Sequence, residues 1–244
     1  MADHSAIEWT ESTWNPTTGC TKVSPGCDRC YAERLVIRFP KSFPNAFALT
    51  LRESTLELPF RWRRPRMIFV NSMSDLFHSD VPESYIARVF DVMARCPQHT
   101  FQVLTKRAER LIRLAPRLPW PSNVWMGVSV ESPAYRWRID YLRETPAATR
   151  FISAEPLIAA LPNLNLADVH WLNAGGESQA GARPAETAWF EDLRDQCAHA
   201  QVAFFLKQLG GHPSKRGGTE ALLGGRRWIE LPKTRTSTLQ PLEA

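Results

Sequence analysis

Three cysteines near the start of the chain are spaced so that they could hold a metal centre. Cys20, Cys27 and Cys30 follow the pattern Cys-x6-Cys-x2-Cys, and the turn signal Pro25-Gly26 lies within the first gap. A turn there would let three thiolates converge from one short segment, residues 19–30, which we call the cysteine loop. A [4Fe–4S] cluster is held by cysteine thiolates, and three of them leave one iron free for a substrate.

The ligand count keeps two other interpretations of the cysteine loop open. A structural zinc site needs four ligands, and the next histidine along the chain is His78, so a zinc ion would need a distant fourth ligand. A loop without any metal is the third interpretation. The other cysteines, Cys96 and Cys197, are isolated in helix-like segments and are expected to be buried. Five cysteines in this distribution are not the even framework of a secreted disulfide protein.

The elements that would position the cysteine loop alternate regularly between apolar strands and amphipathic helices. Helices are expected at 31–39, 82–95, 106–114, 133–143 and 186–200. Strands are expected near 7–9 and at 67–71, 100–104, 123–129, 150–154, 169–174 and 202–206. This alternation predicts an α/β fold made of βαβ units with a parallel sheet. About six or seven parallel strands predict a single partial (β/α) barrel, with the cysteine loop after the first strand.

The domain organisation follows from the same pattern. We expect one domain over residues 1–244, without repeats or linkers. Residues 40–66 are expected to form an excursion, because proline, serine and arginine interrupt any periodicity there. Residues 211–244 are expected to form a basic C-terminal extension.

Polar residues recur where the predicted strands end. In parallel α/β folds, the reactive groups lie just beyond the carboxyl ends of the strands, so we expect these side chains to face one pocket beside the cysteine loop. Taken singly, each could instead be a helix cap, a turn residue or a surface charge. The strand-end candidates are Ser72, Asp75, Lys106, Ser129, Glu131, Glu155 and Glu177.

Composition and charge narrow the class of protein. Hydrophobic residues make up 43% and charged residues 23% of the 244 residues, which excludes a wholly disordered or fibrous chain. The apolar runs are too short for a membrane helix, and the N-terminus lacks the pattern of a secretory signal. These features predict a cytoplasmic protein with no membrane partner.

A net charge of +5 is compatible with a nucleic-acid or phosphate-bearing partner, with a solvated surface as the alternative. The positive charges gather in two clusters. These are Arg61, Arg63, Arg64 and Arg66, and then Lys215, Arg216, Arg226, Arg227, Lys233 and Arg235.

A three-cysteine loop that leads a partial (β/α) barrel resembles the radical S-adenosylmethionine superfamily. The resemblance implies that Cys20, Cys27 and Cys30 hold a [4Fe–4S] cluster and that S-adenosyl-L-methionine binds the free iron. An external electron donor would reduce the cluster, and S-adenosylmethionine would be cleaved to a 5′-deoxyadenosyl radical. The chain departs from the commonest family spacing, Cys-x3-Cys-x2-Cys. It also has Arg29 where an aromatic residue usually precedes the last cysteine.

A closer resemblance, to the phage gene-product-37/gene-product-68 family, covers most of the chain. It is carried by the segments WNPTTGC at 14–20, CDRCYAE at 27–33, SVE at 129–131, ISAEPL at 152–157 and GGES at 175–178. That family occurs in phages and bacteria and has no settled substrate. The resemblance therefore sharpens the expected fold and cluster but does not identify the reaction.

The superfamily resemblance also implies roles for the strand-end groups. Ser72 or Asp75 would receive the amino group of S-adenosylmethionine. Ser129, Glu131 and Lys106 would hold its ribose and carboxylate. Glu155 and Glu177 would serve the ribose, the substrate or a proton transfer, so that Glu155, Glu177 and Lys106 are the candidate catalytic residues.

The leading hypothesis is a radical S-adenosylmethionine enzyme that acts on an unknown substrate, with nucleic acid as one candidate. The rival is a zinc-stabilised nucleic-acid-binding phage protein, since nine tryptophans could stack on bases. A third hypothesis is a metal-free α/β accessory protein in which cysteine substitutions are silent.

Overall fold

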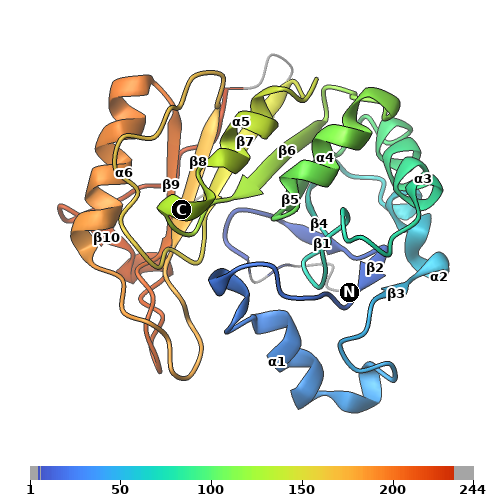
Figure 1. Ribbon diagram of the computed structural model, residues 1–244, viewed down its shortest axis with the longest axis horizontal. Helices are drawn as coiled ribbons and strands as arrows, with labels where there is room; N and C mark the ends of the chain where they lie inside the picture. Colours follow the sequence, from blue (N-terminus) through green and yellow to red (C-terminus); the bar gives the residue numbers. More distant parts are fainter. Residues whose placement is uncertain (1–4, 6, 234–244) are drawn as a thin grey trace.

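The fold is built on one sheet of seven parallel strands, shown by a computed structural model that describes residue 5 and residues 7–233 (Figure 1). The strand order in the sheet is the same as the order along the chain, and the sheet curls into a half-barrel. The predicted α/β partial barrel is therefore confirmed. The strands are β1 (Ser12–Trp14), β4 (Met67–Val70), β5 (Thr100–Thr105), β6 (Val124–Ser129), β7 (Thr149–Ala154), β8 (Trp171–Gly175) and β9 (Ala203–Gln208).

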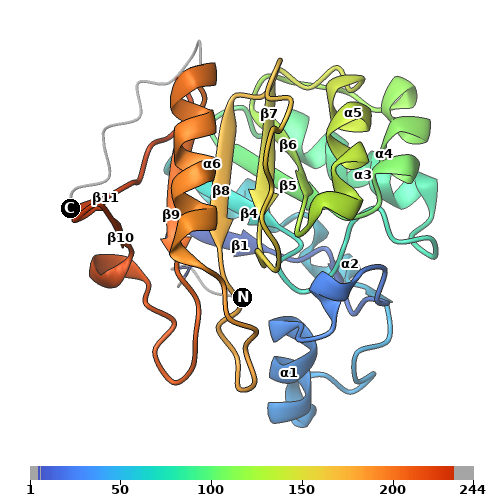
Figure 2. The same ribbon diagram turned by 60° about the vertical axis from the view of Figure 1, so that its left-hand side comes forward.

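Four helices cover one face of the sheet (Figure 2). They are α3 (Glu83–Ala94), α4 (Ala108–Leu114), α5 (Trp137–Arg143) and α6 (Thr187–Ala200). The main buried core joins the helix-facing strand residues, such as Ile68 and Val103, to the apolar sides of the helices, such as Val89 and Leu111. The sequence periodicity predicts this core because alternate strand residues point to opposite faces of a sheet.

The opposite, concave face of the sheet carries an aromatic cluster centred on Trp171. Its ring centroid lies 5.8 Å from that of Trp9, 6.1 Å from that of Trp125 and 5.5 Å from that of Phe151. Trp171 is completely buried, and its indole N–H donates to the Glu230 carbonyl at 2.9 Å. The interior of the half-barrel is thus packed with side chains, and three of the nine tryptophans are used to fill it.

The prediction of a strand near residues 7–9 is wrong, because this segment forms a turn and the first strand is β1. Trp9 packs against Phe69 with the ring centroids 4.7 Å apart, and it is 2% exposed. Its apolar character therefore reflects the filling of the concave face and not a place in the sheet. β1 lies a few residues later and pairs in parallel with β4, with Ser12 opposite Ile68.

The other six strands lie within two residues of their predicted bounds at each end. Helix α1 (Tyr31–Arg38) follows the cysteine loop as predicted. Two short 3-10 turns adjoin helices, η4 (Ala115–Arg117) after α4 and η5 (Pro133–Tyr135) before α5, and a third, η1 (Pro25–Cys27), lies within the cysteine loop.

The predicted excursion at residues 40–66 packs back onto the segment that leads into the cysteine loop. Its strand β3 (Thr50–Leu51) pairs antiparallel with β2 (Thr17–Thr18), just before Cys20. The Trp14 indole N–H also donates to the Thr55 carbonyl at 2.8 Å. The excursion therefore braces the loop. Its remaining elements are η2 (Pro40–Ser42), α2 (Glu53–Leu56) and η3 (Leu58–Arg61).

The C-terminal segment runs along the free edge of β9. The Leu206 N–H donates to the Trp228 carbonyl at 2.7 Å, and the Glu230 N–H donates to the Phe204 carbonyl at 3.0 Å. This segment contains η6 (Gly218–Glu220), β10 (Leu222–Leu223) and β11 (Arg226–Arg227). The last part of the predicted basic extension, 234–244 with Arg235, lies outside the described residues. No helix in the part of the chain that the structure describes is long and apolar enough to cross a membrane.

Candidate functional site

The cysteine loop connects β2 to α1 at the carboxyl edge of the sheet. Its three cysteines are free and partly exposed, and Cys30 is the residue immediately before helix α1. Ser24 Oγ lies 3.8 Å from Cys27 Sγ. The loop thus presents three uncommitted thiols at the edge where the strand-end groups lie.

Two glycines allow the cysteine loop to approach its neighbours closely. Gly19 has a φ of +82°, and a Cβ atom there would lie 2.1 Å from the Ala48 carbonyl oxygen. A Cβ on Gly26 would lie 3.0 Å from Cγ and 3.1 Å from Oε1 of Glu131. The middle of the loop therefore rests directly on the strand-end carboxylate that follows β6.

Cys20 is held beside an ion pair formed at the ends of β4 and β5. Arg107 Nη1 lies 3.5 Å from Cys20 Sγ and 3.0 Å from Asp75 Oδ2. Asp75 also accepts hydrogen bonds from Thr105 Oγ1 at 2.8 Å and from the Lys106 N–H at 3.0 Å. Because both carboxylate oxygens already have donors, Asp75 orients Arg107 toward the cysteine.

The same neighbours set the acidity of the Cys20 thiol. Burial is the main cause that raises its pKa, and the negative charge of Asp75 adds to the rise. Arg107 offsets part of this effect through its charge and its hydrogen bond to the sulfur. A positively charged partner is therefore needed to stabilise the thiolate at this position.

Glu131 lies beneath the cysteine loop in a buried ion pair with Arg138. Its Oε2 is 2.8 Å from Arg138 Nη1, and the two side chains are 0% and 2% exposed. The same Nη1 donates to the Ser129 carbonyl at 2.8 Å. Glu131 Oε1 is buried and has no hydrogen-bond partner among the described residues. This oxygen is the one that faces Gly26, so a buried acceptor is available under the loop.

Glu177 ties the end of β8 to the other side of the cysteine loop. It accepts hydrogen bonds from the Arg183 N–H at 2.8 Å and Nε at 3.1 Å, and Arg29 Nη1 lies 3.5 Å away. Arg183 in turn donates to the Pro25 carbonyl at 2.7 Å. Burial would raise the pKa of Glu177, but the Arg183 hydrogen bonds outweigh it, so the pKa is lower than usual.

Ser72 and Glu155 complete the row of strand-end groups. Ser72 Oγ donates to Asn15 Oδ1 at 3.2 Å, and the Ser72 carbonyl accepts a hydrogen bond from the Tyr31 hydroxyl. Glu155 forms an ion pair with Lys207 of β9. Each of the four strand-end carboxylates thus has a cation as its partner.

The structure brings most of the predicted site residues to the cysteine loop, but not all. Asp75, Glu131 and Glu177 reach the loop directly or through an arginine, and Ser72 reaches Tyr31, which immediately follows Cys30. The Lys106 side chain lines a pocket between α4 and α5, beside the cysteine loop. Glu155 has Lys207 as its hydrogen-bond partner.

Sequence reasoning assigned no role to the cations that pair with these carboxylates. Arg107 directly follows a strand and could have been found from that position alone. Arg138 lies on a helix and Arg183 in a loop, and nothing in the sequence indicates that they pair with Glu131 and Glu177. The cations are Arg29, Arg107, Arg138, Arg183 and Lys207.

The donor set of the cysteine loop matches an iron–sulfur cluster in chemistry, because such clusters are held by cysteine thiolates. The loop carries three free thiols, the sulfur of Cys20 lies 3.5 Å from Arg107 Nη1, and the charge of Cys27 acts on Cys20. Among the described residues, no three Cys, His, Asp or Glu side chains are grouped so that they could hold a metal ion as they stand. His78, the histidine nearest in sequence, contacts Thr21 Oγ1 through Nε2 at 2.9 Å and accepts the Asp80 N–H at Nδ1 at 3.2 Å.

Comparison with known proteins places the chain in a family without assigning it an activity. No curated protein and no solved structure matches it. Residues 4–232 match a family model that is described as a protein of unknown function (DUF5131). Since this match covers nearly the whole chain, the protein belongs to the DUF5131 family.

Proposed function

We propose that the protein is an iron–sulfur enzyme of the radical S-adenosylmethionine type. One observation carries this proposal: three free cysteines on one loop lie over the carboxyl edge of a parallel half-barrel, where the strand-end ion pairs also lie. The resemblance to the gene-product-37/gene-product-68 family supports the expected cluster but not a particular reaction, and it stays a prediction. In this proposal Cys20, Cys27 and Cys30 hold a [4Fe–4S] cluster.

When bound and reduced by an external donor, such a cluster supplies the electron that cleaves S-adenosylmethionine into methionine and a 5′-deoxyadenosyl radical. The protein supplies orientation, charge and exclusion of water. Arg107 is placed to stabilise the thiolate of Cys20, because its guanidinium lies 3.5 Å from the sulfur. The packed aromatic cluster around Trp171 closes the half-barrel against solvent from within.

The strand-end groups differ in how ready they are to receive S-adenosylmethionine. Asp75 already accepts four donors, so we assign it the positioning of Arg107. Glu131 has a buried oxygen without a donor beside the loop, which suits a hydroxyl or ammonium group. We therefore propose that Glu131 is the first contact for S-adenosylmethionine. Glu155 remains a candidate for proton transfer, with Lys207 as its ion-pair partner.

The experiment that tests the proposal is anaerobic purification and reconstitution with iron and sulfide. We expect about four irons per chain and, in the reduced protein, an electron paramagnetic resonance signal that shifts when S-adenosylmethionine is added. Cys27→Ala should lose both the iron and the signal. Cys96→Ala is the matched control, because Cys96 is 1% exposed and belongs to the main core.

Two results would overturn the proposal. Stoichiometric zinc without iron would favour the zinc-stabilised nucleic-acid-binding protein. A metal-free chain in which Cys27→Ala and Cys96→Ala behave alike would favour a non-catalytic accessory protein.

A further inference from the structure

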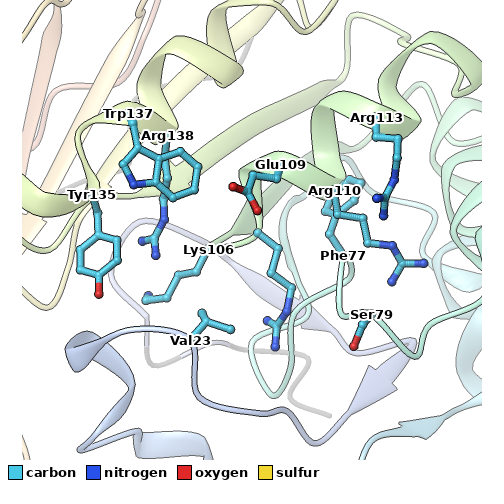
Figure 3. A pocket seen from close by; sticks show the side chains of 11 residues that line it. Val23, Phe77, Ser79, Lys106, Glu109, Arg110, Arg113, Tyr135, Trp137 and Arg138 are labelled. Atoms are coloured by element: carbon cyan, nitrogen blue, oxygen red, sulfur yellow. The ribbon is translucent and has the colours of Figure 1, made fainter.

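A pocket of about 320 Å³ lies between α4 and α5, beside the cysteine loop (Figure 3). Eleven residues line it, of which five are lysine or arginine and one, Glu109, is acidic. Val23 brings the cysteine loop to its edge. The pocket therefore combines a strong excess of positive charge with a position next to the candidate site.

The two ends of the pocket differ in chemistry. Figure 3 shows the rings of Tyr135 and Trp137 beside Arg138 at one end, and the guanidinium groups of Arg110 and Arg113 at the other. Trp137 is 37% exposed and is the single tryptophan among the exposed large apolar residues of the described chain. An aromatic end and an arginine end suit a ligand that carries a flat ring and a phosphate.

Several of the cations have no acidic partner to neutralise them. Lys106 and Arg113 form no ion pair within residues 5 and 7–233. Arg110 donates to two backbone carbonyls, those of His78 and Val81, and not to a carboxylate. Burial and then the like charge of Arg113 lower the pKa of Arg110. Three cations at one pocket without an ion pair among the described residues, against the single lining acid Glu109, favour binding of a negatively charged group.

Arg138 adds a buried, incompletely paired group at the aromatic end. It is 1% exposed, and its Nε has no hydrogen-bond partner among the described residues. Its guanidinium carbon lies 4.2 Å from the Tyr135 ring centroid and 5.6 Å from the Trp137 ring centroid. This arrangement fixes both rings at the pocket wall, and it connects the pocket to Glu131 under the cysteine loop.

We infer that this pocket binds a nucleotide, with its phosphate at Arg110 and Arg113 and its base at Tyr135 and Trp137. S-Adenosylmethionine is a poor fit, because its sulfonium and ammonium groups give it a net positive charge, which Lys106, Arg110 and Arg113, unpaired within the described chain, would repel. The nucleotide is either free or one unit of a single strand, since both sources share this chemistry. The inference concerns binding alone and does not rest on the proposed iron–sulfur chemistry.

The test is fluorescence anisotropy with a short fluorescein-labelled single-stranded oligonucleotide, on protein with and without reconstituted iron. Arg113→Gln and Trp137→Leu should each weaken binding about tenfold at low salt. Arg113→Gln should also lower the salt slope by about one. Arg117→Gln is the matched control, because Arg117 pairs with Glu83 and does not line the pocket. Arg63→Gln controls for the other basic cluster. Equal thermal unfolding midpoints would show that the variants fold.

Competition by small molecules identifies the ligand. Adenosine 5′-monophosphate should displace the probe. A free nucleotide is the source if it binds as tightly as the oligonucleotide, and a strand is the source if the oligonucleotide binds more tightly. The inference is overturned if inorganic phosphate competes as well as the nucleotide, or if S-adenosylmethionine displaces the probe. It is equally overturned if Arg63→Gln, and not Arg113→Gln or Trp137→Leu, abolishes binding.

Discussion

Arg107 joins Asp75 to Cys20. Its Nη1 lies 3.0 Å from Asp75 Oδ2 and 3.5 Å from Cys20 Sγ, and its Nη2 donates to the Thr21 carbonyl at 3.0 Å. The segments that follow two adjacent strands and the first cysteine are therefore linked through one side chain. A group that orients a metal ligand in this way usually has a large effect on metal affinity.

Replacing Arg107 should weaken cluster binding without unfolding the protein. Arg107→Met removes the charge beside Cys20, and we expect about tenfold weaker iron retention in a chelator competition. Arg107→Lys should retain part of the affinity, because a cation remains. Arg117→Met is the control on the same face of the protein. Equal iron retention in Arg107→Met and Arg117→Met would show that Arg107 does not support the cluster.

Thiol labelling should separate the loop cysteines from the core cysteines. Burial raises the pKa of Cys197 to about 12 and also raises that of Cys96, and both side chains are buried. At about pH 8, roughly one Cys197 thiol in ten thousand is ionised. Iodoacetamide should therefore modify the native iron-free protein at Cys20, Cys27 and Cys30 alone, with Cys20 slowed by its raised pKa.

Peptide mass spectrometry reads out this labelling. Reconstitution with iron and sulfide should protect the three loop cysteines. Rapid labelling of Cys197 in the native protein would contradict the packing described here, and labelling unchanged by reconstitution would contradict the ligand assignment.

The fold could be predicted largely from the sequence, because strand position and strand-end chemistry are local signals. Asp75, Glu131 and Glu177 each come two to five residues after the end of a parallel strand, so their place at one edge follows from parallel pairing. The wrong prediction of a strand at Trp9 shows where this kind of sequence analysis fails. In the sequence, a buried aromatic residue of a strand cannot be distinguished from one that fills the inside of a barrel from a loop.

The partners of the strand-end carboxylates could not be predicted in the same way. Arg138 reaches Glu131 from a helix, and Arg183 reaches Glu177 from a glycine-containing loop, so each pairing depends on tertiary packing. The number of tryptophans does not indicate base stacking, since most of the nine are buried in the interior. Only the exposure of Trp137, which the sequence does not reveal, identifies it as a candidate contact.

Breaking the buried pair between Glu131 and Arg138 should destabilise the fold. Glu131→Gln leaves Arg138 buried without a counter-charge, and we expect a loss of about 3–5 kcal/mol in the free energy of unfolding measured with urea. The double variant Glu131→Gln, Arg138→Met should recover part of this loss. Glu53→Gln removes one partner of an exposed pair with Arg88 and should have little effect. A double variant less stable than Glu131→Gln would show that Arg138 acts mainly by packing.

Glu177 should make the stability depend on pH in the acid range. Its pKa is lower in the folded chain than the ordinary value of 4.5, because Arg183 and Arg29 favour its ionised form despite burial. The ionised carboxylate therefore stabilises the folded state at neutral pH, and this contribution is lost as the pH falls below about 4.5 through the folded value.

Urea unfolding of wild type and Glu177→Gln at several pH values measures this contribution. We expect the variant to be less stable by about 1–3 kcal/mol at neutral pH, with the difference shrinking as the carboxylate becomes protonated. Glu144→Gln, at an exposed glutamate after α5, should match wild type throughout. A difference that stays constant down to acid pH would contradict this prediction, because it would show that the ionisation of Glu177 is not the source of the stabilisation.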